Sequence, residues 1–134
     1  MKKLMLGLML AFAMTAEADT VTVDGIKYLL DTTHKTAGIT GYVSGQSPTS
    51  ITDTTVEYLN ETYIVTYVAN SAFRDCSNLT SVSLPTVTTI GQYAFYGCSS
   101  LTSVSLPRAI VIGGSAFSVC RLLTAVSYAY CRTD

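Results

Sequence analysis

The stretch VTTIGQYAFYGCSSLTSVSLPR, residues 87–108, decides the fold because close copies of it stand directly before and after it. Residues 65–86 read VTYVANSAFRDCSNLTSVSLPT, and residues 109–130 read AIVIGGSAFSVCRLLTAVSYAY. Ala, Phe, Cys, Leu and Val recur at the same five positions of every copy, at a constant spacing. A chain with such a period folds as a stack of similar units, each of which buries its apolar face against its neighbours.

The end of each copy has the chemistry of a half-buried β-strand. From Leu79 to Leu84 apolar and polar residues alternate, which directs Val82 and Leu84 inward and the serines between them outward. Pro85 ends this strand, and Pro107 ends the next one, because proline has no N–H to donate to a strand ladder. Strands of neighbouring copies are expected to pair in parallel.

The middle of each copy supplies the rest of the core. The Ala-Phe step is expected in a short helical or 3₁₀ turn on the return side, opposite the strand. Gly91 and Gly113 mark tight backbone positions between the two sides. Equivalent side chains then form two columns through the stack. These columns are Phe73, Phe95 and Phe117, and Cys76, Cys98 and Cys120.

The length and motif of the copies indicate the class of repeat, because a period of roughly 20–29 residues carrying L-x-x-V-x-L is the signature of leucine-rich repeats. We therefore predict a β-rich leucine-rich-repeat solenoid, with short parallel strands and short helical or 3₁₀ turns on the return side. The repeat region is residues 65–134, with copies at 65–86, 87–108 and 109–130 and the start of an incomplete fourth copy.

Residues 19–64 do not follow the repeat, yet they have strand chemistry. Asp24-Gly25 is a hairpin-turn signal within residues 21–30, and residues 38–43 form a second β-prone stretch. Residues 51–56 resemble the strand end of a repeat, and an insertion over residues 58–63 is expected to form a hairpin. The region is predicted to be an N-terminal β-hairpin cap, since a solenoid needs its first apolar edge covered.

Residues 1–18 have the pattern of an export signal. Lys2 and Lys3 form a positive start, residues 4–14 are apolar, and Ala16-Glu17-Ala18 provides the small-x-small cleavage site. This apolar run is shorter than the roughly 20 residues that a membrane-spanning helix needs. We expect a secreted or cell-surface protein that begins at Asp19 and has no membrane span in its mature chain.

The motif of Ile90–Pro107, I-G-x-x-A-F-x-x-C-x-x-L-T-x-V-x-L-P, resembles the BspA-like leucine-rich repeat of bacterial and some protist surface proteins. The resemblance covers residues 65–130, and residues 19–64 are similar to the β-rich leader that often precedes such repeats. It implies an extracellular protein, with some members tied to adhesion to host matrix proteins or to other cells. Val68-Ala69 and Tyr128-Ala129 depart from the motif at its Ile-Gly and Leu-Pro steps.

Two surfaces are candidates for binding a protein partner. The outward strand face carries small hydroxyl side chains. These residues either bind a partner or only keep the strands soluble, and the sequence favours neither reading. Tyrosine and arginine, which are enriched at interface hot spots, gather instead at the turns and on the return side. The strand-face candidates are Ser81, Ser83, Ser103, Ser105, Ser127 and Thr102, and the candidate anchors are Tyr93, Tyr96, Arg74, Arg108 and Arg121.

No residue pattern indicates catalysis, a metal or another cofactor. His34 is the only histidine and is expected in a surface loop, and Asp75 is the only carboxylate in residues 65–130. The cysteine column is expected to consist of buried free thiols, because side chains stacked one strand apart stay too distant for a disulfide. Cys131, at the C-terminal end, is a candidate for pairing with another chain and for self-association.

Charge argues against nucleic acid as the partner. Without residues 1–18 the chain has 6 basic and 8 acidic residues, which are too few and too scattered to neutralise phosphates. The favoured function is a non-catalytic interaction or adhesion module that binds a protein, with host matrix or another cell surface as candidate partners. The alternative is a structural or truncated fragment of a larger surface array with no binding role of its own.

Overall fold

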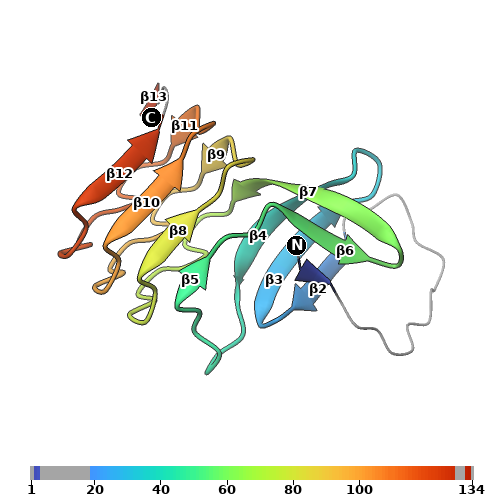
Figure 1. The fold of residues 1–134 in the computed structure, drawn as a ribbon, viewed down its shortest axis with the longest axis horizontal. Coiled ribbons are helices and arrows are strands. Elements are labelled where there is room, and N and C mark those ends of the chain that lie inside the picture. The colour runs from blue at the N-terminus through green and yellow to red at the C-terminus, as the bar shows by residue number, and fades with distance from the viewer. Residues whose placement is uncertain (1, 4–18, 129–131, 134) are drawn as a thin grey trace.

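The computed structural model describes residues 2–3, 19–128 and 132–133, and every regular element in these residues is a β-strand (Figure 1). The strands form two sheets, and the buried side chains make one continuous core between them. The core runs from the N-terminal strands through all three copies. Most of the expected export signal, and Cys131, lie outside the described residues.

The first sheet contains the strands that the alternating pattern predicts. Its order is β12 (Ala125–Tyr128), β10 (Ser103–Leu106), β8 (Ser81–Ser83) and β5 (Ser50–Ile51), and all three pairings are parallel. Ser103 pairs with both Ser81 and Ala125, its equivalents in the copies before and after, so each of these steps along the sheet is one repeat period. Figure 1 shows these four strands side by side at the front of the molecule. Parallel pairing at the repeat period is confirmed.

A second sheet was not anticipated on the return side. The first copy contributes the end of the long strand β7 (Glu61–Val68), and the next two contribute the short strands β9 (Thr89–Ile90) and β11 (Val111–Ile112). The three strands pair in parallel in that order. β13 (Arg132–Thr133) follows β11. The return side is therefore more regular than expected, because its β-branched residues complete a second inter-copy ladder.

The N-terminal region continues this second sheet. β2 (Asp19–Val23), β3 (Ile26–Asp31) and β4 (Thr36–Tyr42) form an antiparallel meander. Asp24 and Gly25 connect β2 to β3 with φ of 49° and 80°, as in the type I′ turn that the Asp-Gly pair favours. β4 then pairs in parallel with β7. The region is thus a three-stranded extension of the sheet rather than a separate hairpin.

The end of β4 takes the place of a preceding repeat copy. The N–H of Ala69 donates to the carbonyl of Ile39 at 2.8 Å, just as Gly91 donates to Val68 one copy later. The Tyr42 ring stacks on Phe73, with 5.9 Å between centroids and 4° between planes. The N-terminal strands therefore cover the apolar end of the first copy with matching backbone and ring contacts.

In the chain, an extra hairpin lies between β5 and β8, the first two strands of the first sheet, which we call the repeat sheet. Ser50 pairs with Ser81, which in turn pairs with Ser103, so the first step along the sheet is longer than the repeat period. The extra residues form β6 (Thr55–Tyr58), which pairs antiparallel with β7 through a turn at Leu59 and Asn60. β1 (Lys2–Lys3) pairs in parallel with the outer edge of β6. The hairpin expected over residues 58–63 is present, and it begins at residue 55.

The helical or 3₁₀ turns expected on the return side are not confirmed, because the described residues contain no helix there. Each copy instead makes separate i→i+3 turns, as where the Ala72 N–H donates to the Ala69 carbonyl at 3.3 Å. Two positions in every copy have left-handed backbones, with φ between 56° and 71°, and these interrupt any run of right-handed turns. Alternate N–H groups donate across to the next copy, as from Phe73 to Ala94 at 2.7 Å. The left-handed residues are Ser71, Asp75, Tyr93, Gly97, Ser115 and Val119.

The phenylalanines form the column that the period predicts. Phe73 and Phe95 lie 5.4 Å apart between ring centroids, and Phe95 and Phe117 lie 5.2 Å apart, with planes within 9° of parallel. Phe73 and Phe95 are fully buried, whereas Phe117 is half-buried. Val126, whose counterparts are buried, is 44% exposed because β12 is the edge strand of its sheet.

Close backbone contact explains the repeated glycine. A Cβ on Gly91 would lie 2.5 Å from the Asn70 nitrogen, and one on Gly113 would lie 2.5 Å from the Gln92 nitrogen. Successive copies approach too closely at this corner for any larger residue. The interpretation of these glycines as tight backbone positions is confirmed.

Replacing Phe95 by Ala should lower the free energy of unfolding by about 3–5 kcal/mol, because it removes the middle ring of the column and leaves a cavity. Chemical denaturation followed by circular dichroism measures the change. Ser105→Ala, on the solvent side of β10, is the control and should change stability by less than about 0.5 kcal/mol. An unchanged unfolding midpoint for Phe95→Ala would show that the column contributes little to stability.

Replacing Val119 by Gly should stabilise the protein. A β-branched residue at φ of 62° is strained by roughly 1–2 kcal/mol, and glycine removes this strain. The greater flexibility of glycine in the unfolded chain cancels roughly half of that gain. The expected gain of about 0.5–1 kcal/mol is measurable by the same denaturation. Gly97→Ala, at the equivalent position, should destabilise because its Cβ would overlap the Asp75 Oδ1. A lower midpoint for Val119→Gly would contradict this explanation.

Candidate functional site

The outward strand face is a shallow hollow of small side chains. It has a volume of about 480 Å³ and is lined by residues of β8, β10 and β12, including Ser81, Ser105 and Ser127. Its neighbouring threonines are already engaged: Thr102 Oγ1 donates to the Thr80 carbonyl at 3.0 Å. The hydroxyl hydrogen of Thr102 therefore serves the inter-copy ladder. The serines remain candidates for contact with a partner.

Three of the five candidate anchors lie together on the turns of the return side. The Arg74 guanidinium lies 5.5 Å from the ring centroid of Tyr93 and 5.1 Å from that of Tyr96. The two rings meet edge to face, with 5.7 Å between centroids. Arg74 Nε also lies 3.6 Å from Asp75 Oδ2. We call Arg74, Tyr93 and Tyr96 the arginine–tyrosine cluster.

The repeat geometry builds this cluster from two copies. Arg74 belongs to the first copy, and the tyrosines are at positions 93 and 96 of the second, so stacking brings them level. The left-handed backbone at Tyr93 leaves its side chain 41% exposed. Arg108 and Arg121 are exposed at other turns, and neither makes a cation–π contact with an aromatic ring of the described residues.

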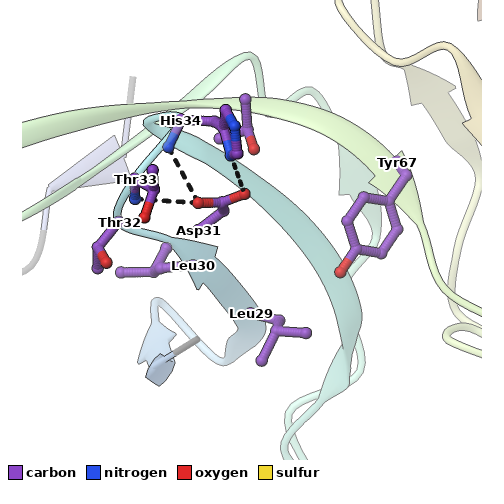
Figure 2. A pocket seen from close by; sticks show the side chains of 8 residues that line it. Leu29, Leu30, Asp31, Thr32, Thr33, His34 and Tyr67 are labelled. Atoms are coloured by element: carbon purple, nitrogen blue, oxygen red, sulfur yellow. Dashed lines mark hydrogen bonds and ion pairs between the residues drawn. The ribbon is translucent and has the colours of Figure 1, made fainter. Parts of the chain in front are cut away.

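A second hollow lies on the outer face of the N-terminal strands, where the chain turns from β3 into β4 (Figure 2). It has a volume of about 420 Å³. His34 lies in an exposed turn, as expected for a surface loop, and the sequence carries no motif that marks the residues around it. We call this hollow the N-terminal pocket. Its lining is Leu29, Leu30, Asp31, Thr32, Thr33, His34, Thr36 and Tyr67.

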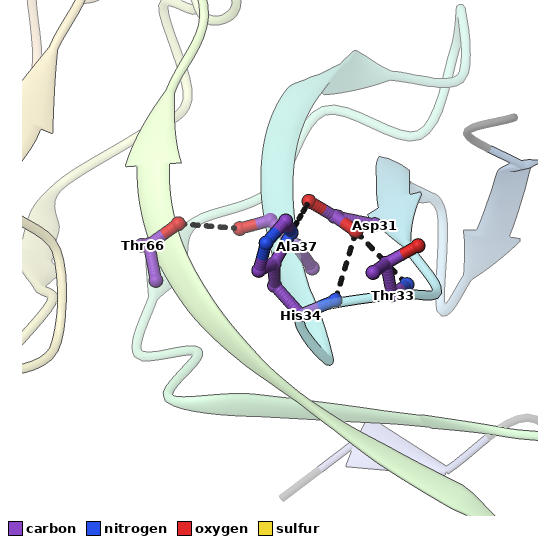
Figure 3. Close-up of polar contacts among 5 residues, drawn as sticks. All are labelled: Asp31, Thr33, His34, Ala37 and Thr66. Atoms are coloured by element: carbon purple, nitrogen blue, oxygen red, sulfur yellow. Dashed lines mark hydrogen bonds and ion pairs between the residues drawn. The ribbon is translucent and has the colours of Figure 1, made fainter. Parts of the chain in front are cut away.

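Asp31 organises the turn inside this pocket (Figure 3). Its Oδ1 accepts the backbone N–H groups of Thr33 and His34, both at 2.9 Å, and its Oδ2 lies 2.7 Å from His34 Nδ1. The backbone N–H of His34, followed by its side chain, lowers the pKa of Asp31. Because the ionised carboxylate only accepts hydrogen bonds, His34 Nδ1 must donate and Nε2 remains available.

A β-bulge and a glycine place Tyr67 on the opposite wall. Ala37 pairs with Val65 but Gly38 pairs with Tyr67, so Thr66 is the extra residue, and its Oγ1 lies 3.5 Å from the Ala37 carbonyl (Figure 3). A Cβ on Gly38 would overlap Tyr67 Cζ, so the ring covers the space that a side chain would fill. Burial, followed by the charge of Asp31, raises the pKa of Tyr67.

The cysteine column consists of free thiols that serve the packing of the copies. Cys98 Sγ donates to the Phe73 carbonyl at 3.1 Å, and Cys120 Sγ donates to the Phe95 carbonyl at 3.0 Å. Burial raises the pKa of Cys98 to about 12 and raises the pKa of Cys120 as well. A thiol with a raised pKa is a poor nucleophile, because the thiolate is the reactive form.

The part of the chain that the structure describes contains no group of three or more His, Cys, Asp or Glu side chains arranged to hold a metal ion. Within the same residues, no helix has the length and apolar character needed to cross a membrane.

The parallel strands, the constant step between copies and the Phe column define a leucine-rich-repeat protein. A family model described as the BspA-type leucine-rich repeat region, with six copies, matches residues 49–131, and the chain belongs to this family. The match begins before residue 65, in agreement with β5 as the first strand of the repeat sheet. A search of curated proteins gave no significant match.

Crystal structures of bacterial leucine-rich-repeat proteins are similar to this chain. A leucine-rich cell surface protein from Faecalibacterium prausnitzii is 31% identical, with a TM-score of 0.69 over 82% of this chain and 32% of its own. A protein from Bacteroides capillosus is 30% identical, with a TM-score of 0.74 over 86% of this chain and 87% of its own. A leucine-rich-repeat protein of T. pallidum is 29% identical, with a TM-score of 0.67 over 81% of this chain and 50% of its own.

In the folded protein, iodoacetamide should alkylate Cys98 far more slowly than Cys120. A pKa near 12 in place of 9 lowers the thiolate fraction at pH 8 roughly a thousandfold, and Cys98 is buried whereas Cys120 is half-buried. The folded protein holds this proton more tightly than the unfolded chain, so the stabilisation is complete below pH 9 and is lost as the pH rises toward 12.

Peptide mapping by mass spectrometry after timed alkylation measures both rates. Under denaturing conditions, where burial is removed, the two cysteines should react at similar rates. Equal rates in the folded protein would contradict the assignment of Cys98 as a buried structural thiol.

Proposed function

We propose that this protein is a non-catalytic interaction module of the cell surface, which binds a protein partner through the arginine–tyrosine cluster. The observation that carries the proposal is the packing of the exposed Arg74 against the rings of Tyr93, which is exposed, and Tyr96, which is half-buried. Tyrosine and arginine are the residues that most often dominate the energy of protein interfaces. The "cell surface" in the name of the Faecalibacterium prausnitzii relative supports the location.

Area and composition favour the cluster over the strand face as the anchor. Four strands about 4.8 Å apart, with two to four residues each at about 3.3 Å, expose on the order of 200 Å². A standard interface takes about 800 Å² from each partner. The strand face offers serine hydroxyls over this small area, so its role is to extend a contact anchored elsewhere.

The greater length of two similar leucine-rich-repeat proteins favours a second candidate function. The chain spans 32% of the Faecalibacterium prausnitzii protein and 28% of a Bacteroides ovatus leucine-rich-repeat protein. In this alternative the residues serve as a structural segment of a larger surface array and bind nothing themselves. The two candidates differ in whether the chain alone adheres to a partner.

Beads coated with the protein from Asp19 onward should adhere to immobilised matrix proteins, with laminin and collagen as the first probes. As a soluble monomer the protein should bind with a dissociation constant on the order of micromolar or weaker, and clustering on beads should strengthen this by about 10² to 10⁴-fold. Arg74→Ala or Tyr96→Ala should weaken monomer binding by about 30-fold, as expected for a hot spot of about 2 kcal/mol.

Arg108→Ala is the matched control, because it removes the same charge from an exposed turn outside the cluster and should leave binding unchanged. Ser105→Arg tests the strand face. If Ser105→Arg abolishes adhesion while Arg74→Ala has no effect, the strand face is the anchor. If coated beads adhere to no matrix protein or cell, the structural-segment alternative replaces the proposal.

A further inference from the structure

We propose that the N-terminal pocket binds a neutral saccharide, with sugar hydroxyls on Asp31 and His34 and the C–H face of the ring against Leu29 and Tyr67. This site is separate from the arginine–tyrosine cluster and does not depend on it. Its volume of about 420 Å³ is within the range of sites that hold small ligands.

The lining of the pocket is amphipathic. Figure 2 shows the polar groups of the β3–β4 turn on one side, Leu29 below them, and Tyr67 facing them from β7 with its hydroxyl toward the hollow. Leu29 pairs with Gly38, and Gly38 pairs with Tyr67, so the three residues lie in one line across the sheet. An occupant therefore meets both an apolar surface and hydrogen-bonding groups, which a pyranose ring matches with its C–H face and hydroxyls.

The polar groups are held in place before any ligand arrives. Asp31 accepts three hydrogen bonds within the turn, which fix its carboxylate and use three of its roughly four acceptor positions. The remaining position of Asp31 can accept from one sugar hydroxyl, and Nε2 of the neutral His34 imidazole can accept from another. Preorganised groups of this kind lower the entropy cost of binding.

Charge in the pocket favours a neutral ligand. The negative charge of Asp31 is already met by the donors of its own turn, so a cation gains little there. Lys35, in the same turn, lies 3.5 Å from Glu61 and over the Tyr63 ring, so its charge is engaged elsewhere. An anion would therefore meet the Asp31 carboxylate in a pocket that has no lysine among its lining residues.

The bulge and Gly38 determine the specificity of the apolar wall. Thr66 occupies the extra position of β7, and this shift brings Tyr67 into line with Gly38. β-Bulges commonly re-aim side chains next to functional sites. A methyl group at residue 38 would displace the Tyr67 ring, because the added Cβ would overlap it.

Saturation-transfer-difference NMR with D-galactose, D-mannose and N-acetyl-D-glucosamine tests the proposal on the protein from Asp19 onward. At least one of these sugars should bind, with a dissociation constant on the order of millimolar. Asp31→Asn, which keeps the shape of the side chain, and His34→Ala, at a mostly exposed position, should each weaken binding at least tenfold. Gly38→Ala should weaken it through displacement of Tyr67.

Lys35→Ala, in the same turn, and Arg74→Ala, in the arginine–tyrosine cluster, should leave sugar binding unchanged, and thermal melting of every variant checks the fold. Absence of saturation transfer for all three sugars would overturn the proposal. So would tighter binding of glucosamine or sialic acid, which are charged, or equal binding by a folded His34→Ala variant. Loss of matrix adhesion in Arg74→Ala with sugar binding intact would separate the two sites.

Discussion

Backbone hydrogen bonds between successive copies are the constraint on which this structure depends. At one corner Thr124 donates to Thr102 and Thr102 donates to Thr80, and at another Gly113 donates to Ile90. Such bonds form only if every copy follows the same backbone path, because each N–H must meet a carbonyl one strand spacing away. The path includes left-handed positions that recur in each copy, and it brings backbones so close at Gly91 that a side chain has no room. The stacked rings and thiols follow from this ladder.

The period of the sequence predicts part of this ladder. The invariant Phe and Cys residues fixed the phase of the repeat, and the alternation around Val82 fixed the face of each strand, because both patterns report burial directly. The return side was predicted less well. Its short strands, such as Thr89–Ile90, leave no alternation long enough to detect, and left-handed residues as different as Asp75 and Val119 share no composition that marks them. The helical turns expected there are not confirmed for this reason.

The candidate sites were harder to predict than the fold. Arg74, Tyr93 and Tyr96 were identified by residue type, and the period explains how they meet. The N-terminal pocket depends on a bulge at Thr66 and on pairing between segments far apart in the chain. Tyr42 likewise completes the Phe column from outside the repeat. The buried pair of Tyr28 and Asp53, 2.5 Å apart between hydroxyl and carboxylate oxygens, joins β3 to the segment after β5 without any local signal in the sequence.

The hairpin of β6 and β7 shows where this architecture tolerates variation in length. Between Ser50 and Ser81 the chain leaves the stack for the length of this hairpin and then resumes the register of the ladder. The extra length forms a self-paired ribbon, so the spacing of the copies is preserved. Val56 and Tyr63 of this ribbon are buried in the core, whereas its turn is exposed. Loop length can therefore diversify at the turn itself without a penalty to the core. In engineering terms, the turn at Leu59 and Asn60 is a natural insertion point for a peptide tag or a grafted loop.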